Sequence, residues 1–246
     1  MKILAIVQAR ISSRRLPGKV LAPLAGKPTI ARVFEQLSHS RLLDGMLLAT
    51  SEDCTDDELE SWANKLNVPI FRGPLNNVLL RVSRAAREIG KLTPDDAVVR
   101  ITADCPIVEP TVADQVISKF RKECVDYCSN VEPRTFPDGY DVEVIRMSCL
   151  TRAQESAHLS SDLEHVTTFI RRSDDLFTRA SVVHEPDLSH LRLTLDTPED
   201  FENLRELILH IGKRSYISLE DVVRALDNDA DLRSRITVRD EAVTYD

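Results

Sequence analysis

The chain has 246 residues, of which 42% are hydrophobic and 29% charged, a composition ordinary for a soluble globular protein. It contains no run of about 18 apolar residues, which excludes a transmembrane helix, and its N-terminus has no apolar segment long enough for a secretory signal. The five cysteines lack paired zinc-ligand spacing, because Cys124 and Cys128 stand alone as a pair. We therefore expect reduced thiols and a cytoplasmic protein.

The net charge of −8 argues against general nucleic-acid binding. The charge is unevenly distributed: residues 1–40 carry +6, so the remainder of the chain carries −14. A cationic segment in an acidic protein indicates one defined site for an anionic ligand.

Apolar runs of strand length alternate with segments of helical period, which predicts a parallel, doubly wound sheet in a three-layer α/β/α domain. In chain order, strands are expected at 3–7, 46–49, 69–71 and 97–101, and helices at 28–37, 56–66, 76–89 and 110–120. The second half is less regular, with strands expected at 125–129, 140–145, 177–184 and 191–195, and helices at 161–172, 198–211 and after Ser218. We expect Ser161 and Glu164 to form a capping box and the final dozen residues to be a loosely attached tail. Residues 1–246 are thus predicted to be one domain, with an insertion at 130–175.

The segment from Gln8 to Lys19 directly follows the first strand, so it lies at the carboxyl end of the sheet, where open α/β folds bind ligands. It contains four cations among small residues, a combination that suits a triphosphate; they are Arg10, Arg14, Arg15 and Lys19. The segment is neither a Walker loop nor a G-x-G-x-x-G motif, which disfavours kinase chemistry and Rossmann redox chemistry. The alternative is a solvated basic loop.

Two carboxylates follow apolar strands: Asp104 at the end of the fourth strand, and Asp196 late in the chain. Carboxylates at this edge could hold Mg²⁺ against phosphate oxygens. For each, the alternative is a cap of the following helix.

Other charged residues are weaker candidates. Arg72 and Arg81 could reach a phosphate or base, or could be surface charges, whereas Arg84 and Arg87 are assigned to a solvated helix face. Three further side chains could bind the hydroxyls of a polyol, although a lone helical histidine is more often structural: Asp141 and Glu143, placed on one side of a predicted strand, and His165.

Several motifs, taken in order, carry a family resemblance: Gln-Ala-Arg…Arg-Leu-Pro-Gly-Lys, Ala-Thr-Ser, Arg-Ile-Thr-Ala-Asp-Cys-Pro, Pro-Asp-Gly-Tyr-Asp-Val-Glu, Glu-His-Val-Thr and Leu-Asp-Thr-Pro-Glu-Asp. Over residues 2–211 the chain resembles the acylneuraminate cytidylyltransferase family, most closely its spore-coat polysaccharide branch, beside the enzymes that activate sialic acid and KDO. The resemblance implies a nucleotide-diphospho-sugar transferase fold, CTP, Mg²⁺ and often a homodimer. It also implies the reaction of CTP with a sugar acid to give a CMP-sugar and pyrophosphate, for surface polysaccharide synthesis.

The resemblance also assigns residues. Those matching the triphosphate loop are Arg10, Ser13, Arg15 and Lys19, those matching the metal carboxylates are Asp104 and Asp196, and the other nucleotide-binding candidates are Gln8, Ala9, Thr50, Arg72, Arg81 and Thr102. In the mechanism we expect, the acceptor hydroxyl attacks the α-phosphate in line and pyrophosphate leaves. Asp104 and Asp196 hold Mg²⁺, and Arg10, Arg15 and Lys19 hold the β- and γ-phosphates and stabilise the leaving group.

Two positions depart from the family pattern. Ser12 replaces a glycine usual in sialic-acid enzymes, and Thr102 replaces a glutamine found two residues before the metal aspartate, which affects base recognition. Transfer of UMP or GMP to a sugar phosphate, or a non-catalytic nucleotide-binding role, therefore remain alternatives.

Overall fold

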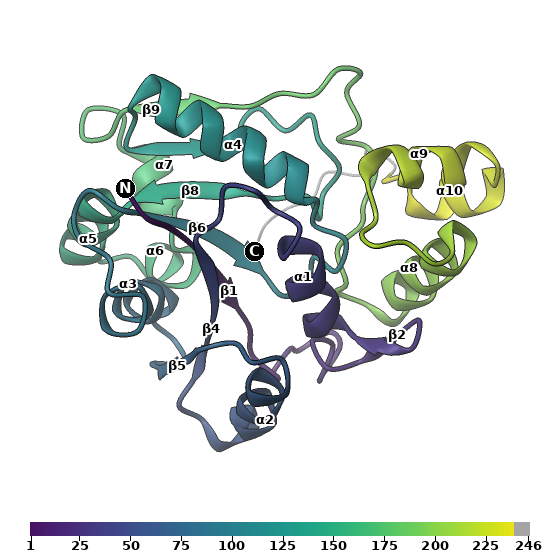
Figure 1. The fold of residues 1–246 in the computed structure, drawn as a ribbon, viewed down its shortest axis with the longest axis horizontal. Coiled ribbons are helices and arrows are strands. Elements are labelled where there is room, and N and C mark those ends of the chain that lie inside the picture. The colour runs from purple at the N-terminus through teal and green to yellow at the C-terminus, as the bar shows by residue number, and fades with distance from the viewer. Residues whose placement is uncertain (239–246) are drawn as a thin grey trace.

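The strand β1 (Ile3–Gln8) is an inner strand of a seven-stranded sheet in the computed structural model, which describes residues 1–238 (Figure 1). Side chains alternate along β1: Ile3, Ala5 and Val7 pack into the core that includes helices α1 and α4, whereas Leu4 and Ile6 pack into the core that includes α3 and α5. A strand that is apolar at every position is therefore buried on both faces. The three-layer, doubly wound architecture predicted from the sequence is confirmed.

The sheet has the order β5-β4-β1-β6-β8-β7-β9. Its other strands are β4 (Gly45–Ser51), β5 (Ile70–Gly73), β6 (Ala97–Thr102), β7 (Tyr127–Ser129), β8 (Glu143–Arg146) and β9 (Arg179–Ser181). Only β8, among these strands, runs antiparallel to its neighbours. The carboxyl ends of the parallel strands therefore meet at one edge, to which β8 contributes Glu143, its first residue, opposite Arg100 of β6.

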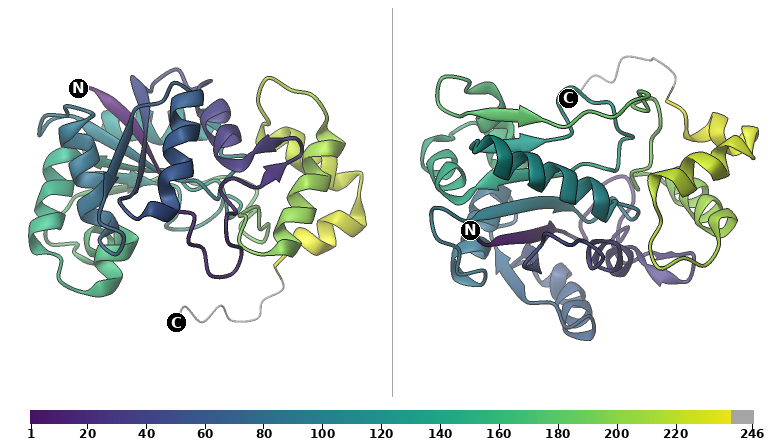
Figure 2. Two further views of the ribbon diagram at one scale, coloured as in Figure 1. Left: turned by 90° about the horizontal axis from the view of Figure 1, so that it is seen from below. Right: turned by 45° about the horizontal axis from the view of Figure 1, so that its top comes forward.

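Helices cover both faces of the sheet, and the last three pack together at one end (Figures 1 and 2). Their bounds are α1 (Thr29–Leu37), α2 (Asp57–Lys65), α3 (Val78–Glu88), α4 (Pro110–Glu123), α5 (Met147–Ser156), α6 (Ser160–His165), α7 (Thr168–Arg172), α8 (Pro198–Ile211), α9 (Leu219–Asp227) and α10 (Ala230–Ile236). A 3-10 turn, η1 (Cys54–Asp56), precedes α2, and a small hairpin pairs β2 (Pro23–Leu24) with β3 (Lys27–Pro28). The sequence analysis missed this hairpin and the helices α5 and α10.

Two expected strands differ from the structure. The strand expected at 140–145 begins only at Glu143, because Gly139 packs against Leu193 and the backbone of Tyr140 and Val142 bonds to Asn130 instead of to a neighbouring strand. The strand expected at 191–195 is absent from the described residues, where this segment forms two isolated bridges, Asp138 with Arg192 and Leu191 with Thr237.

The helix expected at 161–172 is divided into α6 and α7 at Val166, whose φ of 55° cannot continue a right-handed helix. The N-cap of α6 is Leu159, so the predicted capping box at Ser161 is wrong. Of the expected C-terminal tail, residues 235–236 belong to α10 and 239–246 lie outside the described residues.

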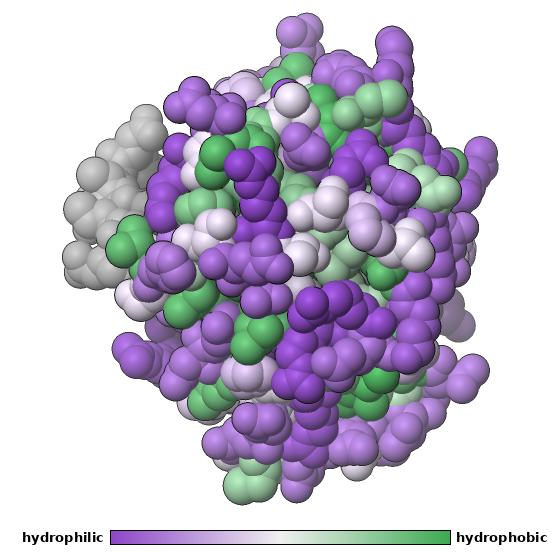
Figure 3. Space-filling view, turned by 90° about the vertical axis from the view of Figure 1, so that its left-hand side faces the viewer, coloured by the Kyte–Doolittle hydropathy of each residue, from purple (hydrophilic) through white to green (hydrophobic). Residues whose placement is uncertain are grey.

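Two further expectations concern membrane-spanning helices and the cysteines. Within residues 1–238, no helix combines the length and the apolar character needed to cross a membrane. The face of the molecule seen in Figure 3 is covered mainly by hydrophilic residues, among which hydrophobic residues form small clusters. The five cysteines are free thiols, and Cys124 is exposed at the end of α4 while Cys128 is buried in β7.

Candidate active site

The loop that follows β1 is anchored to the neighbouring strand β4. The Ala9 N–H donates to the Ala49 carbonyl (3.2 Å), and the Ile11 N–H donates to a carboxylate oxygen of Asp56 (2.8 Å). At the far end of the loop, Gly18 adopts a φ of +72° and its N–H returns to the Ile11 carbonyl (3.1 Å). Glycine is suited to this position because other residues rarely adopt such a φ. The loop is thus closed on itself before it reaches Lys19.

Asp56 is the anchor of this loop and was missed by the sequence analysis. Its buried carboxylate accepts hydrogen bonds from Ile11 N–H (2.8 Å), the Thr50 hydroxyl (2.9 Å), and both the N–H (3.0 Å) and hydroxyl (2.5 Å) of Ser51. The Thr50 hydroxyl also donates to the Ala9 carbonyl (3.0 Å), so Thr50 attaches the start of the loop to β4. In the sequence, Asp56 stands among other acids and cannot be distinguished from a helix-capping residue.

Lys19 lies between the two predicted metal carboxylates. Its Nζ is 2.6 Å from Asp104 Oδ2 and 2.8 Å from Asp196 Oδ1, and the residue is only 9% exposed. Burial opposes the charge of this ammonium, but the two carboxylates outweigh it, so the pKa of Lys19 is raised. Burial alone would raise the pKa of Asp196. The nearby cations Lys19, Arg15 and Arg192 outweigh burial, so the pKa of Asp196 is lowered.

Neither carboxylate caps a helix. The N-cap of α8 is Thr197, which forms a capping box with Asp200, and α4 starts after Glu109, well beyond Asp104. Asp196 instead contacts Arg15 (3.0 Å) through Oδ1 and Arg192 (2.8 Å) through Oδ2. The backbones that carry the two aspartates are also joined, since the Leu195 N–H donates to the Asp104 carbonyl (2.9 Å). The capping alternative considered for both residues is therefore excluded.

This pair of carboxylates fits a magnesium ion. Two segments distant in sequence bring the oxygens of Asp104 and Asp196 to one cationic atom, the ammonium nitrogen of Lys19. Mg²⁺ is usually bound by one or two carboxylates together with substrate phosphates and water. The donor set is thus the one that a metal–nucleotide complex requires.

The remaining cations of the loop are accessible. The Arg15 side chain is 63% exposed, and Arg10 reaches across to α6, where it pairs with Glu164 (3.2 Å). The Ser13 hydroxyl lies 3.5 Å from the Leu16 N–H, within the loop itself. Arg15 and Lys19 thus share Asp196 as a partner, whereas Arg10 is held by Glu164 of α6.

Two other predicted nucleotide-binding arginines have local partners. Arg72 donates to the carbonyls of Ser51 (3.0 Å) and Asp53 (2.8 Å) and pairs with Asp57 and Glu60 of α2. Arg81 is 2% exposed and donates to the carbonyls of Pro74 and Leu75, and burial lowers its pKa to about 10. Both are thus held by local partners, and Arg81 lies close enough to Arg10 for the two charges to interact. Arg84 and Arg87 lie on the outer side of α3, where Arg84 pairs with Glu88 (2.7 Å).

Two further nucleotide-binding candidates, Gln8 and Thr102, lie opposite each other at the ends of β1 and β6. The Gln8 side-chain oxygen accepts a hydrogen bond from Arg100 Nε (3.0 Å), and the Thr102 hydroxyl contacts the Cys105 thiol (3.1 Å). Burial raises the pKa of Cys105 well above its usual value, which keeps this thiol protonated and unreactive.

The three acceptor candidates lie in different environments. Glu143 is 2% exposed, and its carboxylate accepts from Tyr127 OH (2.6 Å) and from the Arg100 guanidinium, so it has little capacity for a substrate hydroxyl. Asp141 precedes β8, so the argument that it shares a strand face with Glu143 fails; it forms a bidentate pair with Arg134 (2.6 and 2.8 Å). His165 is exposed at the end of α6.

A close backbone contact joins the segment before the acceptor candidate Asp141 to the segment that leads to Asp196. Gly139 adopts a φ of +108°, and a Cβ there would lie 2.7 Å from the carbonyl carbon and oxygen of Leu193. The Leu193 N–H donates to the Asp138 carbonyl (2.7 Å), so this glycine lets the two segments run side by side. Burial and the charges of Asp141 and Asp196 raise the pKa of Asp138.

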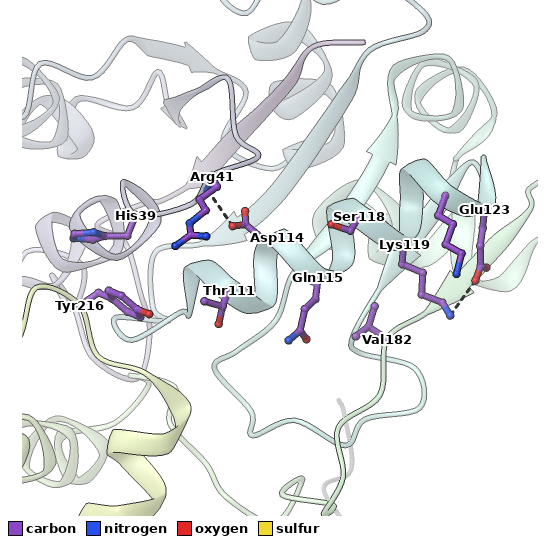
Figure 4. Close-up of a pocket in the computed structure, with 11 residues that line it drawn as sticks. His39, Arg41, Thr111, Asp114, Gln115, Ser118, Lys119, Glu123, Val182 and Tyr216 are labelled. Carbon is purple, nitrogen blue, oxygen red and sulfur yellow. Dashed lines mark hydrogen bonds and ion pairs between the residues drawn. The ribbon is translucent and has the colours of Figure 1, made fainter.

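A second concavity, of about 930 Å³, lies on the outer face of α4 (Figure 4). Its lining includes His39, Arg41, Asp114, Lys119 and Tyr216, and none of the described residues predicted for the site lines it. Within it, Lys119 pairs with Glu123 (3.0 Å), and the Asp114 carboxylate accepts a hydrogen bond from the backbone N–H of Arg41 (3.0 Å).

Comparison with known proteins gives concordant results. Residues 4–229 match the family model described as Cytidylyltransferase. The chain is 32% identical over 237 residues to the spore coat polysaccharide biosynthesis protein SpsF of Bacillus subtilis, covering 93% of this chain and 95% of that protein. It is 35% identical to the 8-amino-3,8-dideoxy-manno-octulosonate cytidylyltransferase of Shewanella frigidimarina over 123 residues, 50% of this chain and 49% of the relative.

Solved structures agree on the fold. A cytidylyltransferase from Leptospira borgpetersenii superposes with a TM-score of 0.89 at 29% identity, covering 97% of this chain and 98% of that one. A CMP:2-keto-3-deoxy-manno-octonic acid synthetase complexed with CTP superposes with a TM-score of 0.62 at 16% identity, covering 84% of this chain and 98% of its own.

Proposed function

The chain belongs to the cytidylyltransferase family of CTP-dependent nucleotidyltransferases, and from this premise we propose that it transfers CMP from CTP to a sugar acid, releasing pyrophosphate. One observation carries the proposal: Asp104, Asp196 and Lys19 converge at the carboxyl edge of the sheet, beside the cationic loop. Two relatives support the acceptor class and a role in surface polysaccharide synthesis, since one is an octulosonate cytidylyltransferase and the other a spore coat polysaccharide biosynthesis protein.

The roles of the residues follow from their charges and positions. Arg10, Arg15 and Lys19 bind the β- and γ-phosphates, and Asp104 and Asp196 hold Mg²⁺. When bound, the ion neutralises charge on the phosphates and on the leaving pyrophosphate. An acceptor hydroxyl oxygen forms a bond to the α-phosphorus in line as the bond from that phosphorus to the β-phosphate oxygen breaks. Positioning and charge neutralisation supply most of the acceleration.

On the acceptor side, Asp141 and His165 remain candidates for hydroxyl contacts. Glu143 acts indirectly, because it holds Arg100, which in turn holds Gln8 at the end of β1. Asp56 and Thr50 maintain the loop in the shape that presents its N–H groups and cations. We further propose a homodimer and a cytoplasmic location.

The experiment that tests this proposal begins with thermal stability in CTP, UTP, ATP and GTP, each with and without Mg²⁺. A nucleotide at about 100 times its Kd stabilises by about 2.7 kcal/mol, which for this chain length corresponds to a shift on the order of 5–10 °C. A shift confined to CTP with Mg²⁺ supports the proposal, and a larger shift with UTP or GTP supports the alternative transferase.

Pyrophosphate release with candidate sugar acids then tests catalysis. Asp104→Asn should abolish release, whereas Lys27→Met should not, because Lys27 forms an exposed pair with Glu35 away from the site. CTP binding without pyrophosphate release from any sugar acid would support the non-catalytic alternative. Full turnover by Asp104→Asn would overturn the proposed role of this residue.

A further inference from the structure

We propose that Arg192 is a positioning residue that fixes the orientation of the Asp196 carboxylate and thereby sets the affinity of the metal site. The inference rests on the proposed function, since it concerns the same carboxylate. Arg192 belongs to the segment expected to be a strand and lies four residues before Asp196.

The two oxygens of Asp196 have different partners. Oδ1 contacts Lys19 (2.8 Å) and Arg15 (3.0 Å), two of the cations proposed to bind phosphate. Oδ2 accepts a hydrogen bond from Arg192 Nη2 (2.8 Å). Because partners on both oxygens restrict rotation about the Cβ–Cγ bond, Arg192 fixes the plane of the carboxylate and thereby aims its other oxygen at Lys19.

Arg192 is itself held on several sides. Its backbone N–H donates to the Ile236 carbonyl (2.9 Å), its Nε lies 3.4 Å from Asp200 Oδ1, and its Nη1 lies 3.5 Å from Asp138. Each of the three guanidinium nitrogens thus faces a different carboxylate. A planar guanidinium can do this, whereas the ammonium of a lysine concentrates its donors on one atom.

Asp200 links this arrangement to the start of α8. Its Oδ2 accepts from the N–H groups of Asp196 and Thr197 (2.9 Å each), while its Oδ1 faces Arg192. The capping residue of the helix therefore holds both the backbone of Asp196 and the arginine that orients the Asp196 side chain. Asp200 therefore ties the Asp196 carboxylate to the start of α8, which restricts the motion of that carboxylate.

The magnitude follows from how metal sites respond to changes around their ligands. Removing a hydrogen-bond partner of a ligating carboxylate typically costs 10–100-fold in metal affinity or activity. We expect Arg192→Gln to weaken divalent metal binding by about this factor. Arg192→Lys keeps the positive charge but loses the planar guanidinium, so we expect a smaller loss of about 3–10-fold, within the range for one ordinary hydrogen bond.

The test uses the whole protein and Mn²⁺ as a paramagnetic substitute for Mg²⁺. Electron paramagnetic resonance gives the Kd of Mn²⁺ in the presence of a non-hydrolysable CTP analogue, so the readout does not depend on turnover. Arg205→Gln is the matched control, because Arg205 lies on α8 and pairs only with exposed Glu202 (3.0 Å) among the contacts described for it. Its Mn²⁺ affinity should equal that of the wild type.

Turnover adds a second criterion. A positioning role predicts that Arg192→Gln needs more Mg²⁺ for half-maximal rate and recovers most of its kcat at saturating Mg²⁺, whereas a purely structural role would lower the melting temperature and leave the Mn²⁺ Kd unchanged. An Arg192→Gln Kd within twofold of the wild type overturns the inference. If this variant does not fold, the same criterion applies to Arg192→Lys. If the wild type itself fails to bind Mn²⁺ with the CTP analogue, the proposed function fails first.

Discussion

The position of Lys19 between Asp104 and Asp196 leads to a prediction of unusual sign: Lys19→Met should increase the affinity of the nucleotide-free protein for a divalent metal. In the structure, the ammonium makes two charge-assisted hydrogen bonds, of 2.6 and 2.8 Å, to the carboxylates that would bind the ion. A metal entering the site without CTP must displace this ammonium or share the carboxylates with it.

The magnitude can be worked from these contacts. Hydrogen bonds to charged groups contribute about 1.5–3 kcal/mol each, so displacing Lys19 costs about 3–6 kcal/mol before the lysine finds other partners. The carboxylates are partly exposed, with side-chain exposures of 27% and 16%, so water recovers part of this cost. We therefore expect a net effect smaller than this range, a gain in metal affinity of about tenfold or more, corresponding to at least about 1.4 kcal/mol.

Isothermal titration with Mn²⁺, with and without CTP analogue, measures both consequences. Metal affinity without nucleotide should rise, and affinity for the nucleotide should fall because a phosphate-binding cation is lost. Lys27→Met is the matched control and should change neither. A Lys19→Met protein that folds and binds Mn²⁺ no better than the wild type without nucleotide would refute the reasoning.

Three further predictions concern stability. Asp56→Ala leaves four donors, including the Ile11 N–H, without their charged acceptor. The free energy of unfolding should fall by about 3 kcal/mol or more, and the melting temperature by about 6–12 °C. A mutant that still shows the full CTP-induced shift in melting temperature would contradict the anchoring role. Gly139→Ala places a methyl group 2.7 Å from the Leu193 backbone at a φ of +108°, so chemical denaturation should show a loss of about 2–4 kcal/mol, and a loss below about 0.5 kcal/mol would be inconsistent with the contact. The folded-state pKa of Asp138 is raised above its usual 3.8, so its charge disfavours folding at neutral pH and this effect disappears as the pH falls below the unfolded value. Asp138→Asn should therefore raise the melting temperature at pH 7, with the gain vanishing near pH 3; a gain that persists there would count against this explanation.

The sequence was most informative where local pattern and function coincide. Strands 3–7, 46–49, 69–71 and 97–101 all formed close to their expected positions, because short apolar runs bounded by turn residues favour strands that pack into the core. The polar residues after such parallel strands then share an edge of the sheet. That rule predicts the meeting of the cationic loop with Asp104, seen in the structure as the 2.6 Å contact of Lys19 with Asp104.

The sequence was least informative where a chain reversal depends on distant contacts. Val166 interrupts a segment with a regular helical pattern, and its positive φ has no local cause in the sequence. The segment 191–195 has the composition of a strand but is held by Asp138, Asp104 and Ile236 instead of a strand partner. In both places, packing against other elements overrides the local preference.

By itself the sequence determined the fold class, the loop that carries the cations and the position of Asp104 beside it, because periodicity and the order of strands fix which residues reach one edge. Asp196 was predicted to follow a strand that did not form, and tertiary contacts bring it to Lys19. Only the tertiary structure decided which charged groups pair and which remain available. It assigned Arg72 to the acids of α2, Glu143 to Arg100, Asp56 to the loop and Arg192 to Asp196. The physical reason is that the energy of a charge depends on its burial and on partners within a few ångströms in space. In three of these four pairs the partners are more than ten residues apart in the chain.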